Sequence, residues 1–127
     1  MWLRRKFYSM KFPIIEIVDR YTIAVVKHKK TNGANQEELD FYIEQMQEVN
    51  LDLQHQLILE LINHHSYVWS LEDDFKKNRI DEMPLEEIGR RALHIRDIGH
   101  IRVDLKNTLA KLLNDPVREI KRDHITE

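Results

Sequence analysis

The sequence predicts a single-domain, all-α protein built as an antiparallel four-helix bundle with a long C-terminal helix. Its 127 residues fit one domain, and a composition of 42% hydrophobic and 33% charged residues with only 3 Gly and 3 Pro is typical of a globular helical protein. Apolar residues recur at three- and four-residue spacing, and no strand-like alternation is found. Short loops between four such segments favour antiparallel packing around one core.

The first two predicted helices have clear starts and stops. Pro13 suits the start of a helix because its missing N–H would have no intrahelical partner there, and Thr31-Asn32-Gly33 should end the mostly apolar segment 14–30. Asn35 followed by Glu38 predicts a capping arrangement for the second helix. The core positions of that helix would be Leu39, Tyr42, Met46 and Val49.

The second pair of helices is predicted to be longer. Asn50-Leu51-Asp52 indicates a tight connection with Asp52 capping the third helix, and one bent helix through this point is the alternative. The third helix should run to about Lys77, and Pro84 should start the fourth, which ends at Asn114-Asp115-Pro116. The bundle would then occupy residues 13–116, between a basic, aromatic arm at residues 1–12 and a charged tail at residues 117–127.

Charge and residue types exclude several classes of protein. The net charge is −2 with acids and bases interleaved, so we expect no nucleic-acid partner. No apolar run approaches the roughly 20 residues of a membrane span, and no signal peptide is indicated. The absence of cysteine excludes disulfides, thiolate chemistry and cysteine zinc sites, and we expect a cytoplasmic protein.

The arm at residues 1–12 has two interpretations. The preferred one is a frayed or packed-down terminus. The alternative is an arm that binds a membrane surface or a protein, because aromatic side chains are interleaved with basic ones. In that case the arm would provide a docking surface or a homodimer contact through Trp2, Phe7, Tyr8 and Phe12.

The most informative pattern is a set of polar residues inside apolar stripes. On the predicted fourth helix, Arg102 falls in the middle of the apolar face, and Arg91 lies on the same line one turn before Ile95. An always-charged guanidinium at such a position must meet a carboxylate, a phosphate or water.

The third helix offers a matching acid. Glu72 should project between two apolar stripes, and therefore inward. His64 and His65 each occupy one of these stripes, and Trp69 follows His65 on the second.

The first helix adds two polar residues at its apolar arc. Thr22 lies inside the arc and Asp19 at its edge. Glu16 and Arg20, on the opposite face, have the spacing of a surface ion pair, so we expect that face to be solvated.

Two interpretations of these polar residues stay open. One is a structural arginine–carboxylate network in the core. The other is a binding module with a pocket for an anionic small ligand, in which Arg91 and Arg102 bind the anion and Glu72 and Asp19 orient them. The candidate ligand-binding residues are Asp19, Thr22, His64, His65, Trp69, Glu72, Arg91 and Arg102. A homo-oligomeric interaction module without a ligand is a further alternative.

Metal-binding spacings are fragmentary. Glu60 with His64 and Asp97 with His100 do not provide the two Glu-x-x-His motifs of a di-metal bundle. Two pairs, Glu16/Asp19 and Glu37/Asp40, have the spacing seen in all-helical nucleoside triphosphate pyrophosphohydrolases, but their order and context do not reproduce that family. A metal-dependent nucleotide hydrolase is therefore kept as an alternative with no metal ligand assigned. The sequence does not decide whether the chain is an enzyme, and it names no cofactor.

Three segments resemble the motifs of a small, uncharacterised all-helical family of bacterial proteins. The stretch Ile17-Val18-Asp19-Arg20-Tyr21-Thr22-Ile23, with Lys27, is similar to its Ile-Asp-Lys-x-Thr-Ile motif. Val68-Trp69-Ser70-Leu71-Glu72-Asp73, with Asn63 upstream, resembles its Leu-Trp-x-Ile-Glu-Asp motif, and Asp97, Arg102 and Lys106 resemble the pattern of its final helix. The resemblance spans residues 14–113. It implies that Asp19, Thr22, Glu72 and Arg102 form a connected set, and it implies no activity.

Overall fold

A computed structural model describes residues 13–76 and 79–115, and within these ranges the protein has the predicted all-α fold. Its helices are α2 (Ile14–Lys30), α3 (Gln36–Glu48), α4 (Gln56–Lys76) and α5 (Leu85–Leu112), with a short 3-10 helix, η1 (Arg79–Glu82), before α5. The four-helix bundle with a long C-terminal helix is therefore confirmed. The arm at residues 1–12 and the tail at residues 117–127 lie outside the described residues, as do the predictions made for them.

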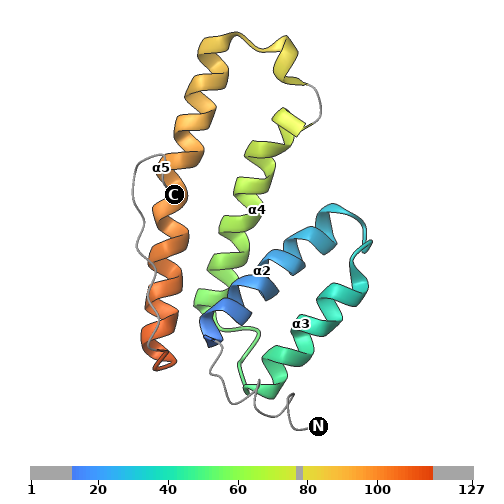
Figure 1. Ribbon diagram of the computed structural model, residues 1–127, viewed down its shortest axis with the longest axis vertical. Coiled ribbons are helices and arrows are strands. Elements are labelled where there is room, and N and C mark those ends of the chain that lie inside the picture. The colour runs from blue at the N-terminus through green and yellow to red at the C-terminus, as the bar shows by residue number, and fades with distance from the viewer. Residues whose placement is uncertain (1–12, 77–78, 116–127) are drawn as a thin grey trace, which may run out of the picture.

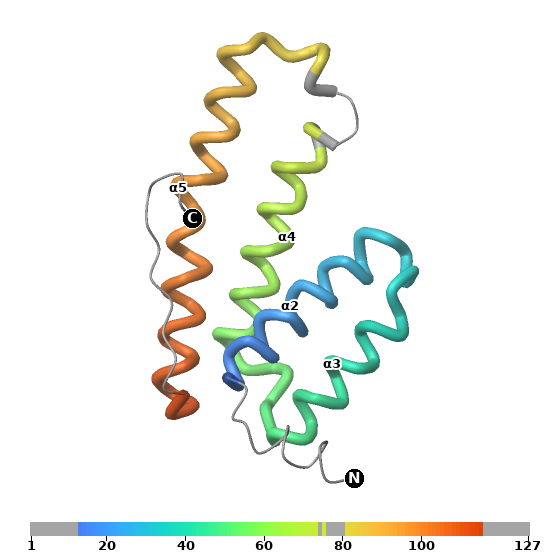
Figure 2. Tube along the Cα trace, viewed as in Figure 1, coloured from blue at the N-terminus to red at the C-terminus, as the bar shows by residue number. Residues whose placement is uncertain are grey.

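The helices form two antiparallel hairpins that pack across one another (Figure 1). α4 and α5 lie side by side, α2 packs against both of them, and α3 packs against α2. The trace shows α4 and α5 continuing beyond the α2–α3 hairpin toward η1 (Figure 2). α2, α4 and α5 therefore meet in one half of the bundle, the half in which α2 begins.

Three helices end in the same way, with an asparagine in the left-handed conformation. Asn32, Asn50 and Asn114 have φ values of 54°, 55° and 56° and follow α2, α3 and α5. In each case the next N–H donates to the carbonyl five residues earlier: Gly33 to His28 (2.8 Å), Leu51 to Met46 (3.1 Å) and Asp115 to Ala110 (2.8 Å). This is the Schellman arrangement, which satisfies carbonyl groups left over at a helix end.

Both side-chain caps predicted from the sequence are wrong. The Asn35 side chain makes no capping hydrogen bond to α3, because its Nδ2 donates to the carbonyl of Ala24 on α2 at 3.2 Å. Asp52 lies four residues before α4, and its Oδ1 accepts from the N–H of Gln54 in a local turn instead. The cap of α4 is His55, whose Nδ1 accepts from the N–H of Leu57 at 3.1 Å.

The hydrophobic core lies where α2 crosses the α4–α5 hairpin. Val18 of α2, Met46 of α3 and Leu61 of α4 are fully buried at its centre. The other buried members of the core cluster are Ile15, Tyr21, Ile58, Leu109 and Ala110. Asp19 and Thr22 are buried beside these residues, so the polar residues of α2 sit directly against the core.

In residues 13–76 and 79–115, no helix combines the length and the apolar character needed to cross a membrane.

Candidate functional site

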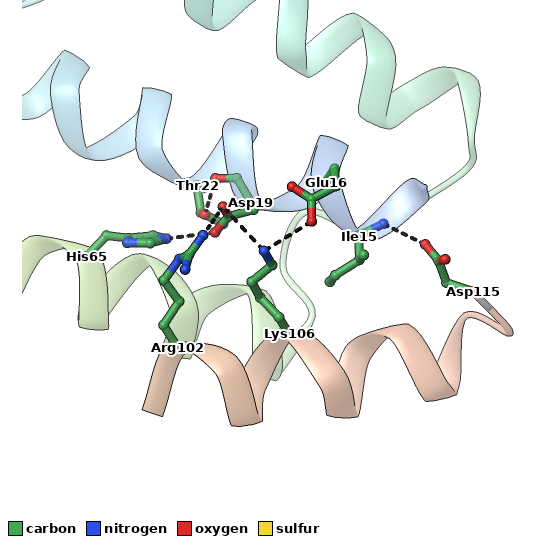
Figure 3. Close-up of polar contacts among 8 residues, drawn as sticks. All are labelled: Ile15, Glu16, Asp19, Thr22, His65, Arg102, Lys106 and Asp115. Carbon is green, nitrogen blue, oxygen red and sulfur yellow. Dashed lines mark hydrogen bonds and ion pairs between the residues drawn. The ribbon is translucent and has the colours of Figure 1, made fainter. Parts of the chain in front are cut away.

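The Asp19 carboxylate of α2 lies at the junction with α4 and α5 (Figure 3). Its Oδ1 is 3.1 Å from Nε2 of His65 on α4, and its Oδ2 accepts from Nη2 of Arg102 on α5 at 2.9 Å. Nζ of Lys106 lies 3.8 Å from the same Oδ2. Since a carboxylate is only an acceptor, Nε2 of His65 must carry the hydrogen. One side chain therefore joins three helices, and it brings together the predicted residues Asp19, His65 and Arg102.

Asp19 is held in its charged form despite its burial. Its side chain is only 6% exposed, and this burial alone would raise the pKa of the carboxyl group. The hydrogen bonds from His65 and Arg102, with the positive charges of Arg102 and Lys106, outweigh burial and hold the pKa of Asp19 well below its usual range. Asp19 is therefore a carboxylate at neutral and mildly acidic pH.

A second pair of charges, Glu16 and Lys106, adjoins the first (Figure 3). Nζ of Lys106 donates to Oε1 of Glu16 at 3.1 Å, and the Lys106 side chain is 3% exposed. The face of α2 that carries Glu16 is solvated in part, as expected: Arg20 is exposed and the Glu16 side chain is 36% exposed, but Glu16 pairs with Lys106 of α5. Two acids three residues apart on α2 face two bases four residues apart on α5. This matched spacing was the signal that could have identified Glu16 and Lys106 as site residues.

Thr22 takes part only through the backbone. Its side chain is fully buried, and its Oγ1 donates to the main-chain carbonyl of Asp19 at 2.7 Å. This bond satisfies the hydroxyl within the helix. Thr22 therefore supports the segment that carries Asp19.

His64 and His65 lie together on α4, with ring centroids 5.9 Å apart. Burial is the main cause that lowers the pKa of His64, and the positive charges of His65, Arg102 and His100 lower it further. Three imidazoles and one guanidinium are therefore close enough to influence one another electrostatically. His64 is neutral at pH 7 in this surrounding.

Three predicted residues lie farther along the hairpin. Trp69 and Glu72 are half-buried on α4, one and two turns beyond His65. Arg91 precedes Arg102 by eleven residues, about 16 Å along α5, and its Nε donates to Oε1 of Glu87 at 2.9 Å. Arg91 therefore lies about three helical turns from Arg102, and its part in an anion site stays a prediction.

Asp115 is a further buried carboxylate, and it was predicted only as part of the end of the last helix. It is 4% exposed, and its Oδ2 accepts from the backbone N–H of Ile15 at 3.0 Å (Figure 3). The N–H groups in the first turn of a helix have no intrahelical partners, so Asp115 caps α2 from a distant part of the chain. This bond ties the end of α5 to the start of α2, next to Glu16 and Asp19.

Three of the four carboxylates with metal-like spacing are engaged with groups of the protein itself. Glu16 and Asp19 both face Nζ of Lys106, and Asp40 accepts from Nε2 of Gln36 at 2.8 Å. Within the described ranges, no group of three or more His, Asp or Glu side chains is arranged to hold a metal ion.

Comparisons with models of protein families, with curated proteins and with solved structures found no match for this chain. The resemblance to a bacterial helical family therefore stays a prediction.

Proposed function

We propose that this protein is a helical-bundle binding module that takes an anionic small molecule at Arg102. One observation carries the proposal. The guanidinium of Arg102 is hydrogen-bonded to a buried carboxylate, yet 33% of the arginine side chain remains exposed. The other basic residue of the network, Lys106, is 3% exposed and is enclosed between Asp19 and Glu16.

A held guanidinium suits an anion for two physical reasons. Its planar set of N–H donors matches the oxygen atoms of a carboxylate or a phosphate. Asp19 also fixes the side chain before a ligand arrives, which lowers the entropy that binding must offset. Asp19 then acts as a positioning residue, as the sequence hypothesis assigned to it.

The charges around Arg102 favour a phosphate or carboxylate over a cation. Asp19 and Glu16 balance Arg102 and Lys106, so the ion pairs themselves add no net charge. Burial is the main cause that lowers the pKa of His64, and the positive charges of His65, Arg102 and His100 lower it further. An anion at Arg102 would offset the positive charges that now lower the pKa of His64, so binding should favour its protonation.

The test is a thermal-shift screen with inorganic phosphate, nucleotides, sugar phosphates and small dicarboxylic acids, each with and without magnesium. A ligand at about 100 times its dissociation constant stabilises the fold by about 2.7 kcal/mol, which raises the melting temperature by several degrees. We expect such a shift in the wild type and its loss in Arg102→Met.

Arg96→Met is the matched control, because Arg96 is an exposed arginine of the same helix whose side chain pairs with the adjacent Asp97. It should keep the shift. Arg102→Lys provides a second variant if Arg102→Met does not fold, as judged by circular dichroism. A purely structural network predicts no shift with any compound, or equal shifts in all variants, and either result would overturn the proposal.

The proposal includes a cytoplasmic location, because a chain without cysteine needs no oxidising compartment.

A further inference from the structure

The outer face of α3 carries exposed carboxylates around one exposed aromatic ring. Phe41 is 54% exposed, and its ring meets that of Tyr42 edge-on, with centroids 5.2 Å apart. At 100° per residue, four exposed acids share the face with Phe41: Glu37, Asp40, Glu44 and Glu48. We call these five residues the acidic face of α3. It lies at the edge of the bundle, because α3 packs chiefly against α2 (Figure 1).

This face is electrostatically unfavourable on its own. α3 has five acidic residues and no Lys, Arg or His, and the ion pair from Lys27 reaches Glu38, which is not part of the face. No ion pair in residues 13–76 and 79–115 joins Glu37, Glu44 or Glu48 to a base. Glu44 lies four residues from both Asp40 and Glu48, and Glu44 and Glu48 stand near the negative end of the helix dipole. A cationic, partly apolar partner would remove this repulsion and cover Phe41.

The chain itself contains a segment of this chemistry, and we propose that residues 1–12 lie along the acidic face of α3 in the same molecule. The segment has no acid, and it alternates cations with large apolar side chains. Its cations are Arg4, Arg5, Lys6 and Lys11, and its aromatic residues are Trp2, Phe7, Tyr8 and Phe12. An arginine or lysine over the Phe41 ring would add a cation–π contact to the ion pairs.

The connection and the length of the segment both fit this position. The segment joins α2 at Pro13, and because α2 and α3 are antiparallel, Pro13 lies at the end of the hairpin where Glu48 ends α3 (Figure 1). Twelve residues span up to about 40 Å when extended, whereas the 13 residues of α3 extend over about 20 Å. The arm can therefore turn back at Pro13 and follow the whole face.

The absence of cysteine makes a direct test simple, because Ser9→Cys creates a unique site for a nitroxide spin label. In the full chain, we expect the label to reduce the NMR intensities of the amides of α3 around Phe41 and Glu44 and to leave α5 unaffected. The reversal Glu44→Lys with Glu48→Lys should restore those intensities. Glu60→Lys, which reverses an exposed acid on α4, is the matched control and should leave the effect unchanged.

The other outcomes would overturn the proposal. Undiminished α3 intensities, or losses confined to another helix, would show that the arm does not occupy this face. A mixture of isotope-labelled protein without the nitroxide and unlabelled protein with it separates contacts within one molecule from contacts between two. Losses on α3 in that mixture equal to those in the single-species sample would instead assign the arm to a second copy of the chain.

Discussion

Replacing Asp19 by Asn removes the charge on which the junction of three helices depends, while it keeps the size and shape of the side chain. The variant leaves Arg102 and Lys106 without the carboxylate oxygen that both of them face. Removing one partner of a buried ion pair costs about 3–5 kcal/mol. Arg102 is 33% exposed and can regain water, and Lys106 keeps Glu16, so we place the loss near the lower limit, about 3 kcal/mol. For a domain of this size, that loss lowers the melting temperature by roughly 10 °C.

The matched control is the same substitution in an exposed ion pair. Asp97 accepts from Nη2 of Arg96 at 2.7 Å, but the two side chains are 61% and 52% exposed, so Asp97→Asn should cost less than about 0.5 kcal/mol. Urea unfolding followed by far-ultraviolet circular dichroism measures both variants, and equal m values would show that the unfolding transitions are comparable. If Asp19→Asn were as stable as Asp97→Asn, the ion pairs of Asp19 would contribute nothing net and our account of the junction would be refuted.

Four further predictions concern the same junction. Because the folded-state pKa of Asp19 is lowered, its stabilisation is complete above the unfolded pKa of about 4 and is lost as the pH falls toward the lower folded value; urea titrations should show this acid loss in the wild type and a smaller one in Asp19→Asn. The folded-state pKa of His64 is also lowered, so stability should rise as the pH increases from the folded value toward the unfolded pKa of about 6.5, and His64→Gln should flatten that part of the profile. Lys106→Met should be milder than Asp19→Asn, and a double-mutant cycle between the two should give a coupling of about 0.5–3 kcal/mol, whereas a coupling of zero would show that they do not interact. Asp115→Ala should cost about 1–2 kcal/mol through the lost cap on Ile15, and hydrogen exchange should speed up first at the start of α2.

The helices were predictable because their ends are marked by local chemistry. A proline precedes both α2 and α5, and an asparagine in the left-handed conformation follows α2, α3 and α5. The predicted caps at Asn35 and Asp52 failed because each side chain found a different partner, one on a neighbouring helix and one in a local turn. A capping side chain can bond to another group instead of the helix N–H. The left-handed conformation at a helix end involves only the backbone and has no such alternative.

The centre of the site was predictable for a related reason. Asp19, His65 and Arg102 are polar residues within apolar stripes. Buried polar groups need hydrogen-bond partners, and these three residues are partners of one another through Asp19. Lys106 was missed because its position on a single helix resembles an exposed one, and only the packing of α5 on α2 buries it. Glu16 was missed because it pairs with Lys106 while 36% of its side chain stays exposed. Arg91 has a local partner, Glu87, within one turn of its own helix.

The arrangement in space depends on inter-helix packing that a single helical wheel does not contain. Leu112 illustrates this point, since it continues the apolar stripe of α5 but is 60% exposed. Lys106, by contrast, is charged and almost completely buried. From residue type and position on the helical wheel of α5, Leu112 would be expected to be buried and Lys106 exposed. The packing of α2 against α5 determines which of the two side chains is buried.

The most direct test of the central claim follows the Arg102 side chain itself during a titration with inorganic phosphate. The Nε–H signal of Arg102 should be visible by NMR, because Asp19 holds the guanidinium in place. Our account predicts a saturable shift of this signal, a weaker affinity in Asp19→Asn, and no matching change at Arg96. An unchanged Arg102 signal, or the same small drift at both arginines, would contradict an anion site and would leave the Asp19 network a structural feature of the bundle.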